Sequence, residues 1–286
     1  MASFQTANPI TTSSTDSNHP RPGVELRWPA SAIWRPGEPA VNAIGLNDLR
    51  DALAKGLDDF KAMPSHAIFL CVMYPLIGLV LFRLAFGQNT LQLVFPMIAG
   101  FALIGPIAAL GLYELSRRRE RGLDTSASHA IDVLKSPSIH AIITLGLVLV
   151  AIFFTWMVTA QALYVQQFGN AAPASVASFA EQLFTTDAGR NLIISGNVVG
   201  LLFAGITLVI SVISFPMLLD QQVSAATAVR ASIRAVLASP FTMAVWGLIV
   251  AAALVLGSLP LFLGLAVVLP VLGHATWHLY RKVVSP

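Results

Sequence analysis

The stretch GPIAALGLYELSRRRERG, residues 105–122, decides how this chain is organised. Its first half is an apolar run that suits the interior of a bilayer. Its second half carries four arginines within five residues, offset only by Glu114 and Glu120. Positive side chains of this kind collect where a helix leaves the hydrocarbon and enters the headgroup layer. We therefore interpret residues 105–122 as the end of a membrane span.

The composition of the whole chain agrees with this interpretation. Of its 286 residues, 56% are hydrophobic and only 11% are charged, which is outside the range of soluble globular domains. The isoelectric point is basic, at about 9.3, but the cations lie beside apolar runs, so we expect no nucleic-acid partner. The sequence predicts an integral membrane protein whose first partner is the lipid bilayer.

Six apolar stretches are long enough to cross a hydrocarbon core of about 30 Å, which takes roughly 20 helical residues. The predicted spans are about 66–87, 90–114, 139–163, 192–218, 241–259 and 261–280. They predict an all-α polytopic bundle of six transmembrane helices, arranged as three hairpins. The last two stretches are so close that one long broken segment is the alternative, although their combined length favours two crossings.

The distribution of positive charge predicts the orientation of these spans. Fifteen of the seventeen Lys and Arg residues lie in the N-terminal segment, in 115–138, in 219–240 or in the C-terminal tail. Because short positive loops stay in the cytoplasm, we expect both termini there. The cations that would anchor span ends among lipid headgroups are Arg117, Arg118, Arg119, Arg121, Arg281 and Lys282. A dedicated site for a lipid phosphate or a protein partner is the alternative for the arginine cluster.

Residues 1–44 differ in composition from the rest of the chain. They are rich in Ser, Thr, Asn and Pro and contain no apolar core, so they predict a disordered cytoplasmic tail rather than a signal peptide. The membrane domain is predicted to cover residues 45–283. We expect Trp28 and Trp34 to rest at the membrane interface, with a docking motif for a partner as the alternative.

An amphipathic pattern that ends at a proline occurs three times, before Pro64, Pro137 and Pro240. Leu53, Leu57 and Phe60 stand eleven, seven and four residues before the first proline, and Val229, Ile233 and Val236 stand at the same distances before the third. The second copy is shorter. The pattern predicts three repeated units, each with an interfacial helix on the cytoplasmic side followed by two spans.

Several stretches resemble one bacterial family of predicted integral membrane proteins, DUF2189. They are AGFALIGPIAALGLYELSRRRERG (99–122), GLDDFKAMPSHAIFL (56–70), the His-Ala-Ile start of the third span and the aromatic-rich last helix. The resemblance covers about residues 45–283 and implies a bacterial inner-membrane location. Some members are labelled putative cytochrome c oxidase subunit I. A catalytic haem–copper subunit needs more spans and more intramembrane histidines than this chain has, so the label leaves only an accessory or assembly role near respiratory complexes.

Two histidines form the only candidate cofactor site. His274 and His278 stand at i and i+4 on the last predicted span, so they share one helix face and could bind haem or a metal. We favour the interpretation that both are interfacial histidines bonded to helix ends, so we expect no cofactor and no metal. Cys71 and Met73 are soft ligand types, but they point in different directions on one helix, so we expect no copper site there.

The interiors of the predicted spans lack charge. No Asp, Glu, Lys or Arg lies near the centre of any span, where ion-coupled carriers and pumps hold charged groups. The deepest polar side chains are Asn197 and Gln161, which we interpret as interhelical contacts, with a substrate site as the alternative. Gly196 and Gly200 in the motif SGNVVG predict close helix packing.

Three functions remain open, and none of them is enzymatic. The chain has no phosphate-binding loop, no recognisable catalytic triad and no HExxH motif, so we assign no catalytic residue. The favoured function is an accessory or assembly factor that binds other membrane components, with respiratory oxidases as candidate partners. The alternatives are a transporter or channel for a small or lipophilic solute, and a haem- or copper-handling protein that uses His274 and His278.

Overall fold

The computed structural model describes residues 39–63, 91–260 and 263–284. The predicted first span and most of the predicted tail lie outside these residues, and so do Trp28, Trp34, Cys71 and Met73. Within the described residues, every element is helical except one isolated β-bridge between Val41 and Val284. The helices are α1 (Leu46–Ala62), η2 (Leu91–Leu93), α3 (Val94–Phe101), η3 (Ala102–Ile104), α4 (Gly105–Ala108), α5 (Leu110–Glu120), η4 (Ala127–Lys135), α6 (Ile139–Phe168), α7 (Val176–Thr185), α8 (Asp187–Ser211), α9 (Ser214–Asp220), α10 (Ala225–Ala238), α11 (Pro240–Ser258) and α12 (Leu265–Val283).

Four helical runs of the described chain are long and apolar enough to cross a membrane. They are Leu91–Glu120, Ile139–Phe168, Asp187–Asp220 and Pro240–Ser258, and they overlap the second to fifth predicted spans. The first of the four is a series of short helices, in which the 3-10 turn η3 leads into α4 with Pro106 in its first turn. This run continues to Glu120, so Arg117, Arg118 and Arg119 lie on the helix itself, and Arg121 caps its C-terminal end.

The six predicted spans are not confirmed as a set. The first lies outside the described residues, and α12, which covers most of the sixth, is not among the four candidate spans. The physical reason is the second half of α12, which carries His274, His278, Arg281 and Lys282 and packs mainly against protein. Only the first half of this helix is as apolar as the prediction assumed.

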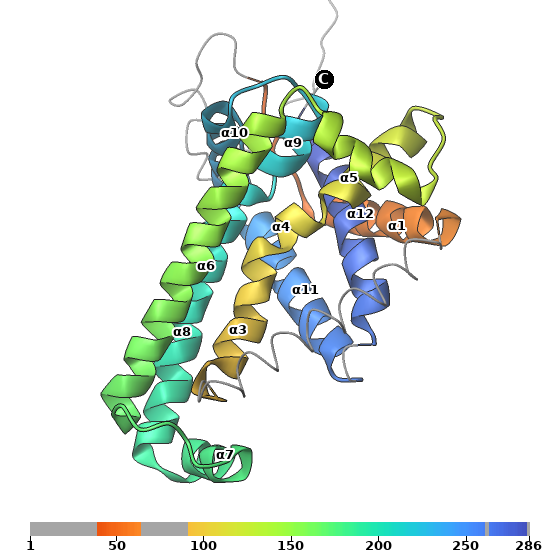
Figure 1. The fold of residues 1–286 in the computed structure, drawn as a ribbon. Coiled ribbons are helices and arrows are strands. Elements are labelled where there is room, and N and C mark those ends of the chain that lie inside the picture. The colour runs from red at the N-terminus through yellow and green to blue at the C-terminus, as the bar shows by residue number, and fades with distance from the viewer. Residues whose placement is uncertain (1–38, 64–90, 261–262, 285–286) are drawn as a thin grey trace, which may run out of the picture.

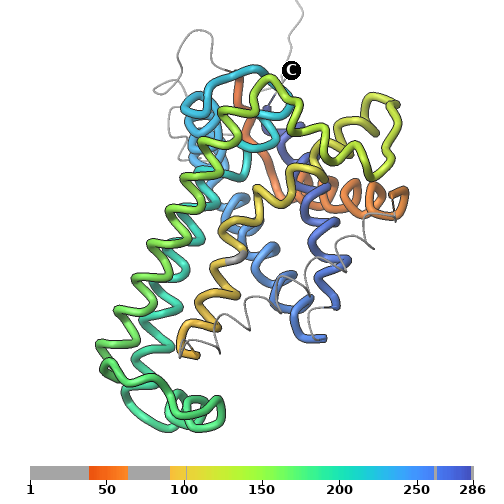
Figure 2. Tube along the Cα trace, viewed as in Figure 1, coloured from red at the N-terminus to blue at the C-terminus, as the bar shows by residue number. Residues whose placement is uncertain are grey.

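The helices are sorted between two ends of the molecule (Figure 1). The long helices α6 and α8 lie side by side, and α7 lies across one end of this pair. At the other end, α9, α10 and α5 gather near the C-terminus, and α1 lies across the bundle. The trace in Figure 2 shows α3 running beside α6 toward the α7 end. The charged residues of α1, α5 and the end of α12 therefore lie at the end of the molecule opposite α7.

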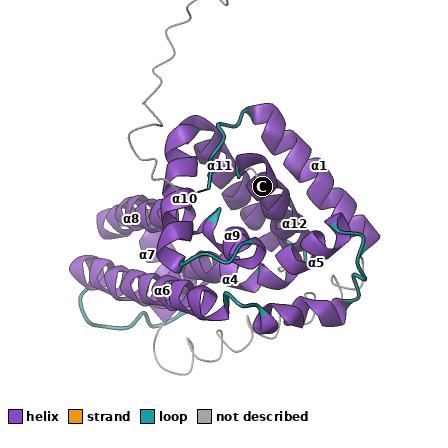
Figure 3. Ribbon diagram, turned by 90° about the horizontal axis from the view of Figure 1, so that it is seen from above, coloured by secondary structure: helices purple, strands orange, loops and turns teal. Residues whose placement is uncertain are grey.

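Helices are observed at the three places where amphipathic interfacial helices are predicted, and each packs on a different neighbouring helix. They are α1, η4 and α10, and each ends two residues before its proline, Pro64, Pro137 or Pro240. The helix α1 packs on α12, η4 packs on α5, and α10 packs on α9, while α5, α9 and α12 also contact one another. Seen from above, α1 and α10 lie on the outside and α9 lies between them (Figure 3).

The second interfacial element differs from the prediction because it is a 3-10 helix. Only fourteen positions separate Gly122, which has a positive φ of 67°, from Pro137. A 3-10 helix rises about 2.0 Å per residue and an α-helix about 1.5 Å. The more extended form lets nine residues of η4 cover a longer path along α5.

The buried face of α1 and α10 lies one position away from the predicted apolar stripe. Ala52, Gly56 and Asp59 stand twelve, eight and five residues before Pro64, and all three are buried. Their counterparts before Pro240 are also small and buried: Ala228, Ser232 and Ala235. Small side chains allow close approach, since a Cβ on Gly56 would lie 2.6 Å from the backbone nitrogen of Ala275.

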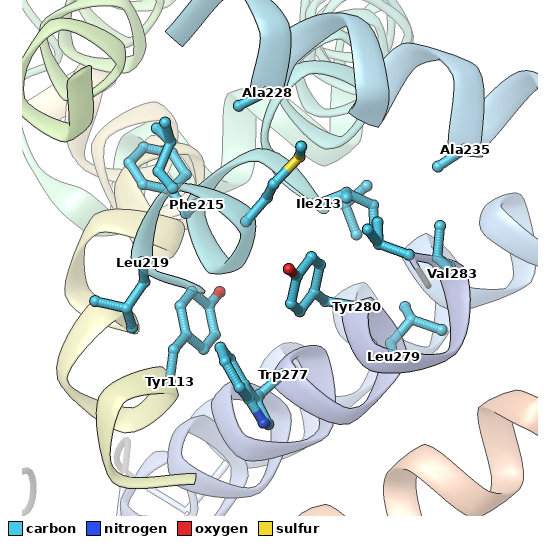
Figure 4. Packing of buried hydrophobic residues seen from close by; sticks show 14 of the residues in the cluster. Tyr113, Ile213, Phe215, Leu219, Ala228, Ala235, Trp277, Leu279, Tyr280 and Val283 are labelled. Atoms are coloured by element: carbon cyan, nitrogen blue, oxygen red, sulfur yellow. The ribbon is translucent and has the colours of Figure 1, made fainter. Parts of the chain in front are cut away.

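The hydrophobic core fills the space between the ends of α5, α9 and α12 (Figure 4). Tyr113, Phe215, Trp277 and Tyr280 converge there, and Trp277 and Tyr280 are fully buried. The segment before α1 also meets the end of α12, because the backbone N–H of Asn42 donates to the carbonyl of Val283 at 2.7 Å. The core therefore holds in place the helix ends that carry the arginine cluster, Asp220, Arg281 and Lys282.

Candidate functional site

The two predicted histidines meet at one carboxylate, Asp59 of α1. The Nε2 of His278 lies 2.9 Å from Oδ2 of Asp59, and the Oγ of Ser116, from α5, donates to the same oxygen at 2.6 Å. The Nδ1 of His274 lies 2.7 Å from the Oγ of Ser116, and His274 is 0% exposed. The i, i+4 prediction that both rings share a helix face is consistent with this convergence. We call Asp59, Ser116, Arg119, His274 and His278 the Asp59 cluster.

The hydrogen-bond pattern fixes which atoms carry protons in the Asp59 cluster. Ser116 has a single hydroxyl proton and donates it to Asp59, so it must accept from Nδ1–H of His274. Nε2 of His278 likewise donates, because an ionised carboxylate only accepts. Arg119 adds an ion pair to Oδ1 of Asp59. Ser116, His278 and Arg119 donate directly to the carboxylate of Asp59, and His274 donates to it through Ser116.

The ionisation of Asp59 reflects this arrangement. Burial disfavours the charged carboxylate, but the hydrogen bonds from His278, Ser116 and Arg119 outweigh burial and lower the pKa of Asp59 from 3.8 to about 2. Asp59 is therefore ionised throughout the physiological pH range. The cluster links α1, α5 and α12 around a charge that is almost fully screened from solvent.

The geometry does not present the two histidines as an open ligand pair. A ligand at Nε2 of His278 would have to displace Asp59, and Nδ1 of His274 already donates to Ser116. In the described part of the chain, no group of three His, Cys, Asp or Glu side chains is arranged to hold a metal ion. Haem or copper binding at His274 and His278 thus stays a prediction, and it would require rearrangement of α1 against α12.

All six predicted anchor cations pair with acidic groups of the protein. Arg119 pairs with Asp59, and the remaining pairs within 4.0 Å are Arg117 and Arg118 with Glu114, Arg118 with Asp132, Arg121 with Asp220, Arg281 with Glu120 and Asp220, and Lys282 with Asp48 and Asp51. Glu114 pairs with two arginines along its own helix, and its carboxylate lies 2.7 Å from Arg117. Their role as lipid anchors stays a prediction.

The acidic partners Glu120 and Asp220 join the ends of α5, α9 and α12. The indole Nε1 of Trp277 donates to Glu120 at 3.1 Å, and the hydroxyl of Tyr280 donates to Asp220 at 2.9 Å. The sequence places Glu120 among the arginines, but it did not predict the contacts that Glu120 and Asp220 make with α12. The only available signal was their position at the predicted span ends, which does not specify contacts between helices far apart in sequence.

The two deepest polar side chains of the predicted spans, Gln161 of α6 and Asn197 of α8, have different surroundings. Gln161 is an interhelical contact as predicted, since it accepts from Gln92 at 3.2 Å. Asn197 instead is exposed on α8, and its Nδ2 donates at 2.7 Å to the carbonyl of Ile193 on its own helix. Gly200 packs against Trp156 of α6, whereas a Cβ on Gly196 or Gly205 would meet nothing within 4 Å. The motif SGNVVG thus has one side packed and one side open.

The central part of the chain is similar to one known protein family. Residues 94–220 match a family model described as a predicted integral membrane protein, DUF2189. No curated protein and no solved structure matches the chain.

The DUF2189 match is narrower than the expected resemblance over residues 45–283. It runs from α3 to α9 and includes Ser116, Arg119 and Asn197. Asp59, His274 and His278 lie outside it. The open face of α8 is therefore contained in the DUF2189 segment, whereas the Asp59 cluster combines residues from inside and outside that segment.

Proposed function

We propose that this protein is a non-enzymatic assembly factor that works inside the membrane, by docking the outer face of α8 on another membrane-embedded helix. In this proposal the protein belongs to a bacterial inner membrane, with both termini in the cytoplasm. The Asp59 cluster and the ion pairs around it then serve to fix the cytoplasmic end of the bundle.

The observation that carries the proposal is the exposed amide of Asn197. This residue lies seven positions after Arg190, which is about 10 Å along a helix. If Arg190 marks the membrane edge, the amide lies about a third of the way into a hydrocarbon core of about 30 Å. A side-chain amide offers two N–H groups and one oxygen, and only one N–H has a described partner. Lipid chains offer none, so a polar partner on a neighbouring helix is favourable.

Other polar side chains on the spans do not create the same demand. Thr155 and Thr159 of α6 and Ser195 of α8 each donate their only proton to a carbonyl four residues earlier, at 2.7 to 2.8 Å. This local bond uses the donor capacity of a hydroxyl group. Asn197 retains both a donor and an acceptor after its local bond, which supports α8 as the docking helix.

A photoreactive amino acid placed on α8 tests the proposal in native membranes. At Val198, which is 57% exposed, we expect a protein adduct of defined size on illumination. The adduct should be lost when Asn197 is also changed to Val. The control site is Leu248 of α11, which is 69% exposed and should give lipid adducts only. Equal, lipid-only labelling at both sites would refute the proposed function.

A further inference from the structure

We infer that the helix that docks on α8 is α8 of a second copy of this chain. This inference rests on the proposed function and names the partner. The surface is defined by Asn197, Leu201, Gly205 and Ile206, and we call it the α8 face. On this face Leu201 is 74% exposed and Ile206 is 52% exposed.

The first argument is the chemistry of the amide. An amide both donates and accepts, so two asparagines that face each other can form a reciprocal pair of hydrogen bonds. A partner that lacks an amide at this depth would need a different donor and acceptor in hydrocarbon, where such groups are rare. A second α8 supplies a matching group without any further requirement.

The second argument is depth. Copies that insert with the same orientation can be related by a twofold axis along the membrane normal, which sets their α8 helices parallel. Each residue of one α8 then lies at the same depth as its counterpart in the other. Asn197 meets Asn197, and Gly205 meets Gly205. The concentration of cations at the end opposite α7 supports a single orientation.

The third argument is shape. The α8 face carries a shallow hollow of about 380 Å³, which is lined by Leu201, Leu202, Gly205, Ile206, Val209 and Ile210. Its accessible surface is almost wholly apolar. A projecting Leu201 or Leu202 beside an open glycine gives one surface that contains both ridges and a recess. This self-complementarity is what a twofold interface between identical helices requires.

Crosslinking of the full chain in lipid vesicles tests this inference. In a Cys71→Ala background, we expect Leu201→Cys to form an intermolecular disulfide on mild oxidation, because residue 201 lies beside the twofold axis. The matched control is Leu248→Cys on α11, which should not crosslink. This pair of variants leaves Asn197 intact, so the result does not depend on how a change at Asn197 is tolerated.

Energy transfer between donor- and acceptor-labelled copies, both labelled at Lys135→Cys, measures the strength of association. We expect Asn197→Val to weaken dimerisation roughly five- to tenfold, since about two interhelical hydrogen bonds are lost. Asn197→Gln should retain most of it, and Gly205→Leu should abolish it. Thr155→Val, which removes an exposed polar group from α6, should leave it unchanged.

The outcomes separate this inference from the proposed function. A monomeric wild-type protein in vesicles, or equal dimerisation of wild type and Asn197→Val, overturns the second-copy partner. If native membranes still give an Asn197-dependent adduct at Val198 that contains a different polypeptide, the proposed function stands and this inference falls. If Val198 labels lipid alone, both fall.

Discussion

At Gly56 the backbones of α1 and α12 come so close that no side chain fits. A Cβ at this position would lie 2.6 to 2.7 Å from backbone and side-chain atoms of Val271 and Ala275. We expect Gly56→Ala to lower the free energy of unfolding by about 1–3 kcal/mol, because rigid backbone must move to admit the methyl group. Thermal unfolding in mild detergent measures the change.

The matched control for Gly56 is Gly196→Ala on α8, where an added Cβ meets nothing within 4 Å. This control should be neutral or slightly stabilising, since alanine favours a helix more than glycine does. Equal destabilisation by the two variants would contradict the close approach of α1 and α12.

Asp59 makes the stability of the protein depend on pH in a defined direction. Its pKa is lowered from 3.8 to about 2 in the folded protein, so its ionised form favours folding by about 2 kcal/mol above pH 4. This contribution is lost as the pH falls through about 2. We therefore expect Asp59→Asn to destabilise the protein at pH 7 by about 2 kcal/mol, and by progressively less below pH 4.

The control for this prediction is the neighbouring Asp58→Asn, because Asp58 is exposed on α1. It should change the free energy of unfolding little at any pH. Unfolding curves from pH 7 to pH 2 test the prediction, and a constant difference between wild type and Asp59→Asn across that range would contradict it.

Residue identity and spacing predicted part of the Asp59 cluster. The i, i+4 spacing of His274 and His278 placed both rings on one helix face, since helix geometry is local. Their partner Asp59 stands more than 200 residues earlier. Such a pairing depends on how α1 docks on α12, and no local pattern in the sequence contains that information.

At the scale of elements, the ion pairs of Lys282 set how α1 lies on α12. Its Nζ lies 2.9 Å from Asp51 and 3.2 Å from Asp48. We expect Lys282→Glu to destabilise the protein by about 1 kcal/mol, and Asp51→Lys in the same chain to restore roughly half of the loss. The difference should shrink at high salt, because these side chains are partly exposed.

Thermal unfolding of the two single variants and the double variant measures this coupling. Lys61→Glu, at an exposed position of the same helix α1, is the charge-matched control. Strictly additive effects of Lys282→Glu and Asp51→Lys would show that the two helices do not meet in this register.

The repeat of interfacial helices shows how far pattern analysis reaches. Counting back from Pro64 and Pro240 aligned α1 with α10 in the correct register, because both helices end at a proline constraint. The predicted apolar stripe is nevertheless not the most deeply buried face of either helix. Leu57 is 38% exposed, whereas Gly56 and Ser232 are buried. Close packing selects small residues, and hydrophobic periodicity gives such residues little weight.

At the scale of the whole molecule, the membrane class and the middle four spans follow directly from long apolar runs. The last helix was harder to predict because its two halves have different surroundings. The half that contains Trp277 and Tyr280 is buried in protein at the charged end of the bundle. Hydropathy measures the preference of a segment for an apolar environment, and it does not distinguish lipid from a protein core.

The distribution of positive charge predicts which end of the molecule faces the cytoplasm. Within the described residues, the α7 end carries Arg190, which is paired with Asp187, whereas η4 and the ends of α5 and α12 carry most of the other cations. Because positive residues stay on the cytoplasmic side, we expect α7 to be external and η4 internal.

In a Cys71→Ala background, Glu181→Cys on α7 should react with an impermeant maleimide in intact cells. Lys135→Cys on η4, which is 81% exposed as lysine, should react only after the membrane is opened. The reverse labelling pattern would invert the orientation, and labelling of both sites in intact cells would indicate mixed orientations, which would remove the equal-depth argument for contact between two α8 helices.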